Sequence, residues 1–115
     1  MRLEAPTITR ETLAAFAATS GDGNPVHLDP EAARAAGQPD VFAHGMLSMA
    51  WLGRLVTSAF PQARLAGLTV RFTAVTPLGA EPVFTLERVD ETSVCLRGEL
   101  ADGTVTVVGR ATLHV

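Results

Sequence analysis

If residues 45–60 form a helix, apolar residues occupy every side of it, and Arg54 is the only charged residue in the segment. A helix that is apolar all round is one that the rest of the fold surrounds. We therefore expect a long central buried helix over 45–60. Its apolar positions are Met46, Leu47, Met49, Ala50, Trp51, Leu52, Leu55, Val56, Ala59 and Phe60.

After this helix the apolar positions recur with a period of two, which is typical of strands that are half buried in a sheet. Pro77 and Gly79 end the first alternating segment, and Asp102-Gly103 is a tight hairpin signal before the last. The expected strands are 68–74, 83–89, 93–100 and 104–115. We expect them to form an antiparallel meander, with Val105, Val107, Ala111, Leu113 and Val115 on one face of the last strand.

Two alanine-rich segments before the central helix indicate short helices. Thr9 can cap the first, which Gly21 would end, and Asp29 can cap the second with Pro30 at its first position and Gly37 beyond its end. Only eight residues precede the first helix, so any strand there must be short. We find no linker, repeat or low-complexity segment, and we expect one α+β domain over 1–115.

The loop between these helices carries the candidate chemistry. It reads Ser-Gly-Asp-Gly-Asn-Pro-Val-His-Leu-Asp over 20–29, and its glycines and proline disfavour regular structure. Asp22 and His27 can converge on one water molecule and act as general base and general acid near neutral pH. The alternative is that Asp22 and Asn24 are ordinary turn residues and His27 is a surface histidine.

Other chemistries fit the sequence less well. His27, Asp29 and His44 imitate a two-histidine, one-carboxylate iron site, but Asp29 is better explained as a helix cap, so we expect no metal. An EF-hand is excluded because His27 stands where the loop needs glycine. No G-x-S-x-G sequence is present, and Ser48 lies within the central helix, which argues against a serine nucleophile.

Composition, net charge and cysteine content reduce the number of possible partners and locations. Apolar residues make up 47% of the 115 residues and charged residues 18%, which suggests that one face is buried against another subunit. A net charge of −3 argues against nucleic acid as a partner. The single cysteine, Cys95, excludes an internal disulfide and fits a reducing cytoplasm. We see no signal peptide and no segment apolar enough to span a membrane.

The loop motif Asp-x-Asn-Pro-x-His-x-Asp, followed by Ala-His-Gly-Met-Leu at 43–47, resembles the MaoC-like hydratases. These are (R)-specific enoyl-thioester hydratases and 3-hydroxyacyl-thioester dehydratases of fatty-acid and polyketide metabolism, with a hot-dog fold. The resemblance extends through Arg-Phe-Thr-Ala-Val-Thr-Pro-Leu-Gly at 71–79 and covers the chain from about Thr7 onward. It implies an antiparallel sheet wrapped around the central helix and a dimer with a continuous sheet.

The resemblance also assigns roles to residues. Asp22 and His27 would be the catalytic pair, and the Gly45 N–H would polarise the thioester carbonyl, as a helix N-terminus can. Asn24, His44 and Ser48 would support the site. For His44 we expect capping or packing more than contact with substrate, and we expect His114 to be solvated.

The resemblance implies reversible syn addition of water to an acyl thioester of coenzyme A or acyl carrier protein, with no cofactor. The partner would be a second copy of the chain, or a related subunit in a heterodimer or larger assembly. Two alternatives stay open: a non-catalytic hot-dog subunit of a heteromeric dehydratase, and a hot-dog acyl thioesterase. The thioesterase is less favoured because its usual carboxylate lies on the central helix, which here has none.

Overall fold

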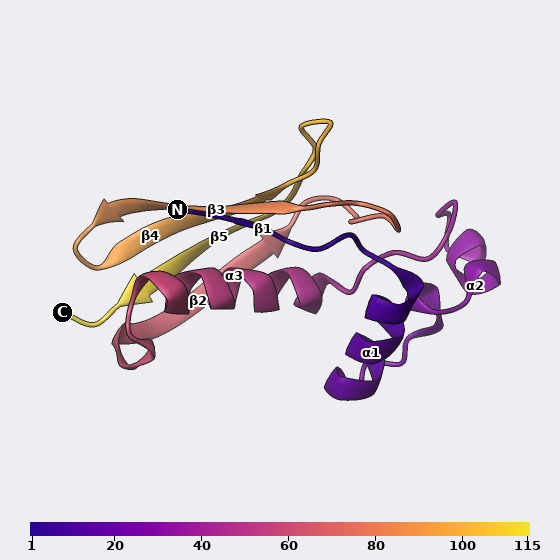
Figure 1. Ribbon diagram of the computed structural model, residues 1–115, viewed down its shortest axis with the longest axis horizontal. Helices are drawn as coiled ribbons and strands as arrows, with labels where there is room; N and C mark the ends of the chain where they lie inside the picture. Colours follow the sequence, from indigo (N-terminus) through magenta and orange to yellow (C-terminus); the bar gives the residue numbers. More distant parts are fainter.

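The computed structural model describes residues 1–115, in which an antiparallel sheet packs against one long helix (Figure 1). This is the expected α+β architecture. The strands are β1 (Arg2–Glu4), β2 (Leu65–Phe72), β3 (Val83–Asp90), β4 (Ser93–Glu99) and β5 (Val105–Leu113). The helices are α1 (Arg10–Ser20), α2 (Pro30–Ala35) and α3 (Gly45–Ala59), with 3-10 turns η1 (Pro25–His27) and η2 (Gln62–Arg64).

The strand order in the sheet is β1-β3-β4-β5-β2, and every neighbouring pair is antiparallel. The hairpins β3–β4 and β4–β5 confirm part of the expected meander. The placement of the first strand in that meander is wrong, because β2 pairs with β5 and not with β3. The connection over 73–82 is too long for a tight hairpin and carries the chain back across the sheet.

Helix α3 lies along the sheet and buries one side against it. Leu52, Leu55 and Val56 are fully buried and pack against Phe84, Leu86 and other inward residues of the strands. The expectation that the helix is buried all round is wrong for a single chain: Met46 is 54% exposed, and Ala50 on the same face is also exposed. The sheet covers one face of α3 and leaves the other open.

A second, smaller core joins α1 and α2 to the start of α3. Leu13, Ala33, Val41 and Leu47 are buried together there. Figure 1 shows α1 and α2 beyond the N-terminal end of α3 and past the end of the sheet. The loop between α1 and α2 is therefore held next to the first turn of α3.

The expected helix caps are confirmed. The side chain of Thr9 accepts a hydrogen bond from the Thr12 N–H, and that of Asp29 accepts one from the Glu31 N–H. Gly21 ends α1 with a φ of 79°, in the left-handed region where a side chain would be strained. These caps fix both ends of the loop over 21–29.

Two strand ends differ from the periodicity. The expected strand over 68–74 begins earlier, at Leu65, and ends at Phe72, where the chain turns away from β5. Val115 lies beyond β5 and is 99% exposed, so it does not share the buried face of Val107, Ala111 and Leu113. Apolar and polar residues go on alternating in the sequence beyond the last residue that pairs with the neighbouring strand. The end of a strand is set by where its partner stops pairing, and the sequence pattern does not show this.

The sheet has one short and one long edge strand. β1 covers only Val83–Thr85 of β3, whereas β2 presents an edge of 8 residues with no strand on its outer side. An open edge of this length is a template for pairing with another strand.

None of the helices has both the length and the apolar composition needed to cross a bilayer.

Candidate active site

The loop after α1 is shaped by short-range hydrogen bonds. A carboxylate oxygen of Asp22 accepts from the Asn24 N–H at 3.2 Å, and the Asn24 side-chain oxygen accepts from the Val26 N–H at 3.2 Å. The second bond caps the turn η1, which delivers His27 at its end. Asn24 thus shapes the loop, and Asp22 keeps its other carboxylate oxygen free of protein partners.

His27 is buried, being only 8% exposed, so the alternative of a surface histidine is wrong. Its Nδ1 lies 2.8 Å from the backbone oxygen of Phe42. Because a carbonyl oxygen can only accept, Nδ1 carries the proton. In the neutral ring Nε2 therefore holds a bare lone pair, which is the form needed for a general base.

The expected convergence of Asp22 and His27 is present in the structure. One carboxylate oxygen of Asp22, one ring nitrogen of His27 and one of His44 all lie within 4.8 Å of one another. A water that makes hydrogen bonds of about 2.8 Å to two groups at a tetrahedral angle spans roughly 4.5 Å. The exposed carboxylate and the buried imidazole are therefore no further apart than about the span of one bridging water.

His44 is in closer contact with this pair than the sequence indicated. Its ring stacks on that of His27, with centroids 3.9 Å apart and planes at 27°. Its Nε2 donates to the backbone oxygen of Asp22 at 3.1 Å, while Nδ1 is buried without a partner. Of the two structural roles expected for His44, packing is confirmed, whereas capping is not, since the side chain makes no capping bond at the N-cap position. The position of His44, just before Gly45 and an apolar helix, was the only sequence signal for its place near the site.

The first turn of α3 offers free hydrogen-bond donors. Neither Gly45 nor Met46 donates its backbone N–H to any protein acceptor, and the helix dipole adds partial positive charge there. The Phe72 ring packs so closely on Gly45 that a Cβ at this position would lie 3.1 Å from it. A side chain at position 45 would have to displace the Phe72 ring by a few tenths of an ångström. The free N–H of Gly45 suits an oxygen that gains negative charge.

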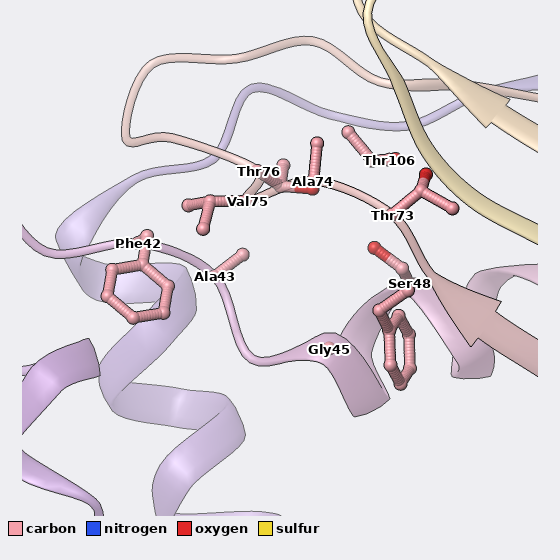
Figure 2. A pocket seen from close by; sticks show the side chains of 10 residues that line it. Phe42, Ala43, Gly45, Ser48, Thr73, Ala74, Val75, Thr76 and Thr106 are labelled. Atoms are coloured by element: carbon pink, nitrogen blue, oxygen red, sulfur yellow. The ribbon is translucent and has the colours of Figure 1, made fainter. Parts of the chain in front are cut away.

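Two cavities are lined in part by residues from the start of this helix. The first, of about 430 Å³, is lined by Gly45 and by the hydroxyl residues Ser48, Thr73, Thr76 and Thr106; we call it the threonine pocket. Figure 2 shows Ser48 pointing from α3 toward the segment that carries Thr73. His27 does not line this pocket, but its Nδ1 donates a hydrogen bond to the backbone oxygen of Phe42, which does.

The second cavity, of about 420 Å³, contains Asp22 and is otherwise mostly apolar. We call it the methionine groove, and its remaining lining residues are Phe16, Ser20, Met46, Met49 and Ala50. The hydroxyl residues of the threonine pocket come from α3, the segment after β2 and β5, so sequence order gave no sign that they meet. Gly45 therefore lines one cavity and Asp22 the other, while His27 lines neither.

A metal-binding reading is weakened by the ring geometry. Asp29 caps α2, as expected, so it does not join His27 and His44 in the iron-like set considered from the sequence, although Asp22 completes a similar set. An imidazole binds a metal in the plane of its ring. The rings of His27 and His44 are stacked with planes only 27° apart, so their lone pairs do not converge on one point.

A sheet wrapped around one central helix defines the hot-dog class of domains. A family model described as the MaoC like domain matches residues 2–110, and the chain belongs to that family. An (R)-hydratase from A. caviae has the same fold, with a TM-score of 0.83 and 27% identity over 100% of this chain and 92% of that chain.

Curated relatives have related names. A 3-hydroxyacyl-thioester dehydratase Z from Mycobacterium tuberculosis is 36% identical over 95% of this chain and 72% of its own. A mitochondrial 3-hydroxyacyl-[acyl-carrier-protein] dehydratase from Arabidopsis thaliana is 35% identical over 68% of this chain, which spans 47% of that protein's length. The chain thus matches about half of the plant relative.

The environment of His44 predicts a dependence of stability on pH. Burial lowers the pKa of His44, a neighbouring positive His27 lowers it further, and the bond to Asp22 partly offsets both effects. The unfolded chain, with an ordinary pKa of about 6.5, therefore binds a proton at a higher pH than the folded protein does. The stability that neutral His44 contributes is complete above about pH 6.5 and is lost as the pH falls through the folded pKa.

We expect the melting temperature of His44→Leu to fall less than that of the wild type between pH 7.5 and pH 5. Thermal unfolding followed by circular dichroism at both pH values measures this. His114→Leu, at an exposed histidine, is the matched control and should keep the wild-type slope. Equal pH slopes for His44→Leu and the wild type would contradict the prediction.

Proposed function

We propose that residues 1–115 form an (R)-specific enoyl-thioester hydratase that also catalyses the reverse dehydration of a 3-hydroxyacyl thioester. The observation that carries the proposal is the spacing of Asp22 and His27, whose polar atoms lie within 4.8 Å of each other and of His44, the residue that precedes the free N–H groups of α3. Membership of the MaoC-like family and the names of the relatives support it.

In the proposed reaction, Asp22 and His27 hold one water between them. One residue takes a proton from the water as the water oxygen bonds to the β-carbon. The other residue, which enters the reaction protonated, gives its proton to the α-carbon. Both act from the same side of the double bond, so the addition is syn. Return of the proton from base to acid restores the pair, and the chemistry involves no change of oxidation state.

The thioester oxygen gains negative charge as the β-carbon is attacked. In the proposed complex it accepts a hydrogen bond from the Gly45 N–H, which has no protein partner. Backbone donors that are fixed before the reaction stabilise such a charge without reorganisation. Ser48 lies one turn further along α3 and lines the same pocket, where it supports this end of the substrate.

The two cavities suggest how the rest of the substrate lies. The threonine pocket offers hydroxyl groups to the amide-containing arm of coenzyme A or of an acyl carrier protein. The methionine groove begins at Asp22 and continues along the apolar residues Met46, Met49 and Ala50, so the acyl tail beyond the β-carbon lies there. The carbonyl between them then falls at Gly45.

Neither alternative function has a feature that favours it. A non-catalytic subunit does not need the paired Asp22 and His27, which are both present and adjacent. A thioesterase of this fold would use a carboxylate on the central helix, and α3 has none. We therefore keep the hydratase as the proposal, with coenzyme A and acyl carrier protein as its two candidate carriers.

We also propose a homodimer in which two copies of β2 pair to form a continuous sheet. β2 is the long open edge, and it ends at Phe72, which is 47% exposed and lines the threonine pocket. A second chain at this edge would cover Phe72 and the adjoining mouth of the pocket. A heterodimer with a related subunit would use the same edge.

The purified protein should hydrate crotonyl-CoA to the (R)-3-hydroxyacyl product. Asp22→Asn and His27→Gln should each lower kcat by about 10²–10⁴-fold, because each removes one member of an acid–base pair. The double variant should be little slower than the slower single variant, since the two act on one water. Absorbance of the enoyl thioester gives the rate, and chiral chromatography gives the configuration.

Asp102→Asn and His114→Gln make the same chemical changes at exposed sites far from the loop and should keep the wild-type rate. Because His27 is buried, circular dichroism must show that His27→Gln is folded before its rate is interpreted. Formation of the (S)-alcohol, or near wild-type rates in both folded single variants, would exclude the proposed reaction.

Substrate orientation is tested by filling the methionine groove. Ala50→Leu should lower kcat/KM for eight-carbon and longer enoyl-CoA substrates by about 10-fold or more, because roughly one to two kcal/mol is lost when a bound methylene chain is displaced. The rate with crotonyl-CoA should stay near the wild-type value. Ala14→Leu on the exposed side of α1 is the control. Equal losses for short and long substrates would place the acyl tail elsewhere.

The dimer predicts a mass of about 24 kDa by light scattering at micromolar concentration, twice the 12.1 kDa of one chain. Alternate backbone amides of Leu65–Phe72 that face away from β5 should also be protected from hydrogen exchange, since they would bond to the partner strand. A monomer mass, or rapid exchange of those outward amides, would rule out this interface.

A further inference from the structure

His44 is a buried ionisable residue that the proposed reaction does not use directly. Its side chain is 1% exposed, and it lines neither the threonine pocket nor the methionine groove. Its Nε2–H donates a hydrogen bond to the backbone oxygen of Asp22. Its Nδ1 therefore carries a buried lone pair that accepts no hydrogen bond. An unpaired buried acceptor costs stability, so a residue that only packs would be better apolar.

The contacts of His44 join the two residues of the proposed catalytic pair. The stack on His27 limits rotation of that ring on one face, while the bond from His27 Nδ1 to Phe42 fixes it at its edge. The bond from Nε2 holds the backbone oxygen of Asp22 and so restrains a loop that is otherwise exposed. Phe16 packs edge to face on His44 at 4.8 Å and keeps the His44 ring in place.

We infer that His44 is a positioning residue that sets the separation of Asp22 and His27, by stacking on one and hydrogen bonding to the backbone of the other. This inference rests on the proposed function. It gives the motif Ala-His-Gly at 43–45 two separate tasks, since His44 orders the acid–base pair and Gly45 offers its N–H to the carbonyl.

The role requires a neutral His44 ring. Asp22 and His27 are the titratable groups that face it, and Phe16 on its other side is uncharged. A second proton on His44 would place an N–H at Nδ1, where no acceptor is present, and a positive charge against the His27 ring. Burial lowers the pKa of His44, which favours the neutral ring that this role requires.

Because His44 lines neither cavity, its replacement should change kcat more than KM. We expect His44→Leu to lower kcat for crotonyl-CoA by about 10–100-fold and to leave KM within about threefold, since a small displacement of reacting groups has effects of this size. Leucine fills the site without an unpaired nitrogen, so the melting temperature at pH 7.5 should be equal to or above that of the wild type.

His44→Gln tests the hydrogen bond separately, because its amide can still donate to the Asp22 oxygen but cannot stack. It should lose less activity than His44→Leu. Val94→Ala is the stability control. Val94 is buried in the main core and lines neither cavity, so this variant should melt lower and keep kcat per folded molecule. The inference is overturned if His44→Leu and His44→Gln both keep kcat within about twofold of the wild type.

Nitrogen NMR of the histidine rings tests the geometry without relying on activity. The wild type should show His44 protonated on Nε2 and His27 on Nδ1, and His44→Leu should shift the His27 ring signals as the stacked ring is lost. A wild-type His44 protonated on Nδ1 would overturn the inference. An inactive wild-type protein with the expected NMR signals would instead contradict the proposed function, and the catalytic part of the inference with it.

Discussion

The packing of α3 against the sheet is the interaction on which the rest of the structure depends. Leu52, Leu55 and Val56 bury the later turns of the helix beneath the strands, and this leaves its first turn beyond the main core. A helix start in that place keeps its N–H groups unpaired and accessible. The smaller core of α1 and α2 then holds the loop with Asp22 and His27 against that turn. The burial of apolar side chains, which has no directional preference of its own, thereby fixes a polar site to within a few ångströms.

The site itself is stabilised less well than the core around it. Two histidines are buried in contact with each other, one nitrogen has no partner, and the carboxylate is carried by an exposed loop. Each of these features costs stability, and a core made of aliphatic residues would avoid them. They are compatible with a function in which one ring must accept a proton and its neighbour must not. A stability cost that is confined to one cluster of polar groups is typical of a functional site.

The MaoC-like fold explains why so short a chain can present two cavities at one point. The helix start borders both cavities, with Gly45 lining the threonine pocket and Asp22 and Met46 lining the methionine groove. The threonine pocket is bounded by β2, whose outer edge is open. The open edge of β2, which ends at the half-exposed Phe72 in the pocket lining, is the edge through which the proposed dimer would form. Association and substrate binding are then coupled by geometry, because the partner strand would lie beside Phe72.

The sequence by itself determined the local structure and the family. Capping residues, the all-round apolar helix and the strand periodicity are short-range signals, and Asp22 and His27 are close in the chain, so their meeting needed only a turn. Contacts between distant segments were decided by tertiary structure alone. β2 pairs with β5 because the long connection after it crosses the sheet, and one face of α3 stays exposed because a single sheet covers only the other. The stack of His44 on His27 also joins residues far apart in the sequence, and no local pattern encodes it. Side-chain contacts of this kind depend on how two cores are placed against each other, which is a property of the folded chain.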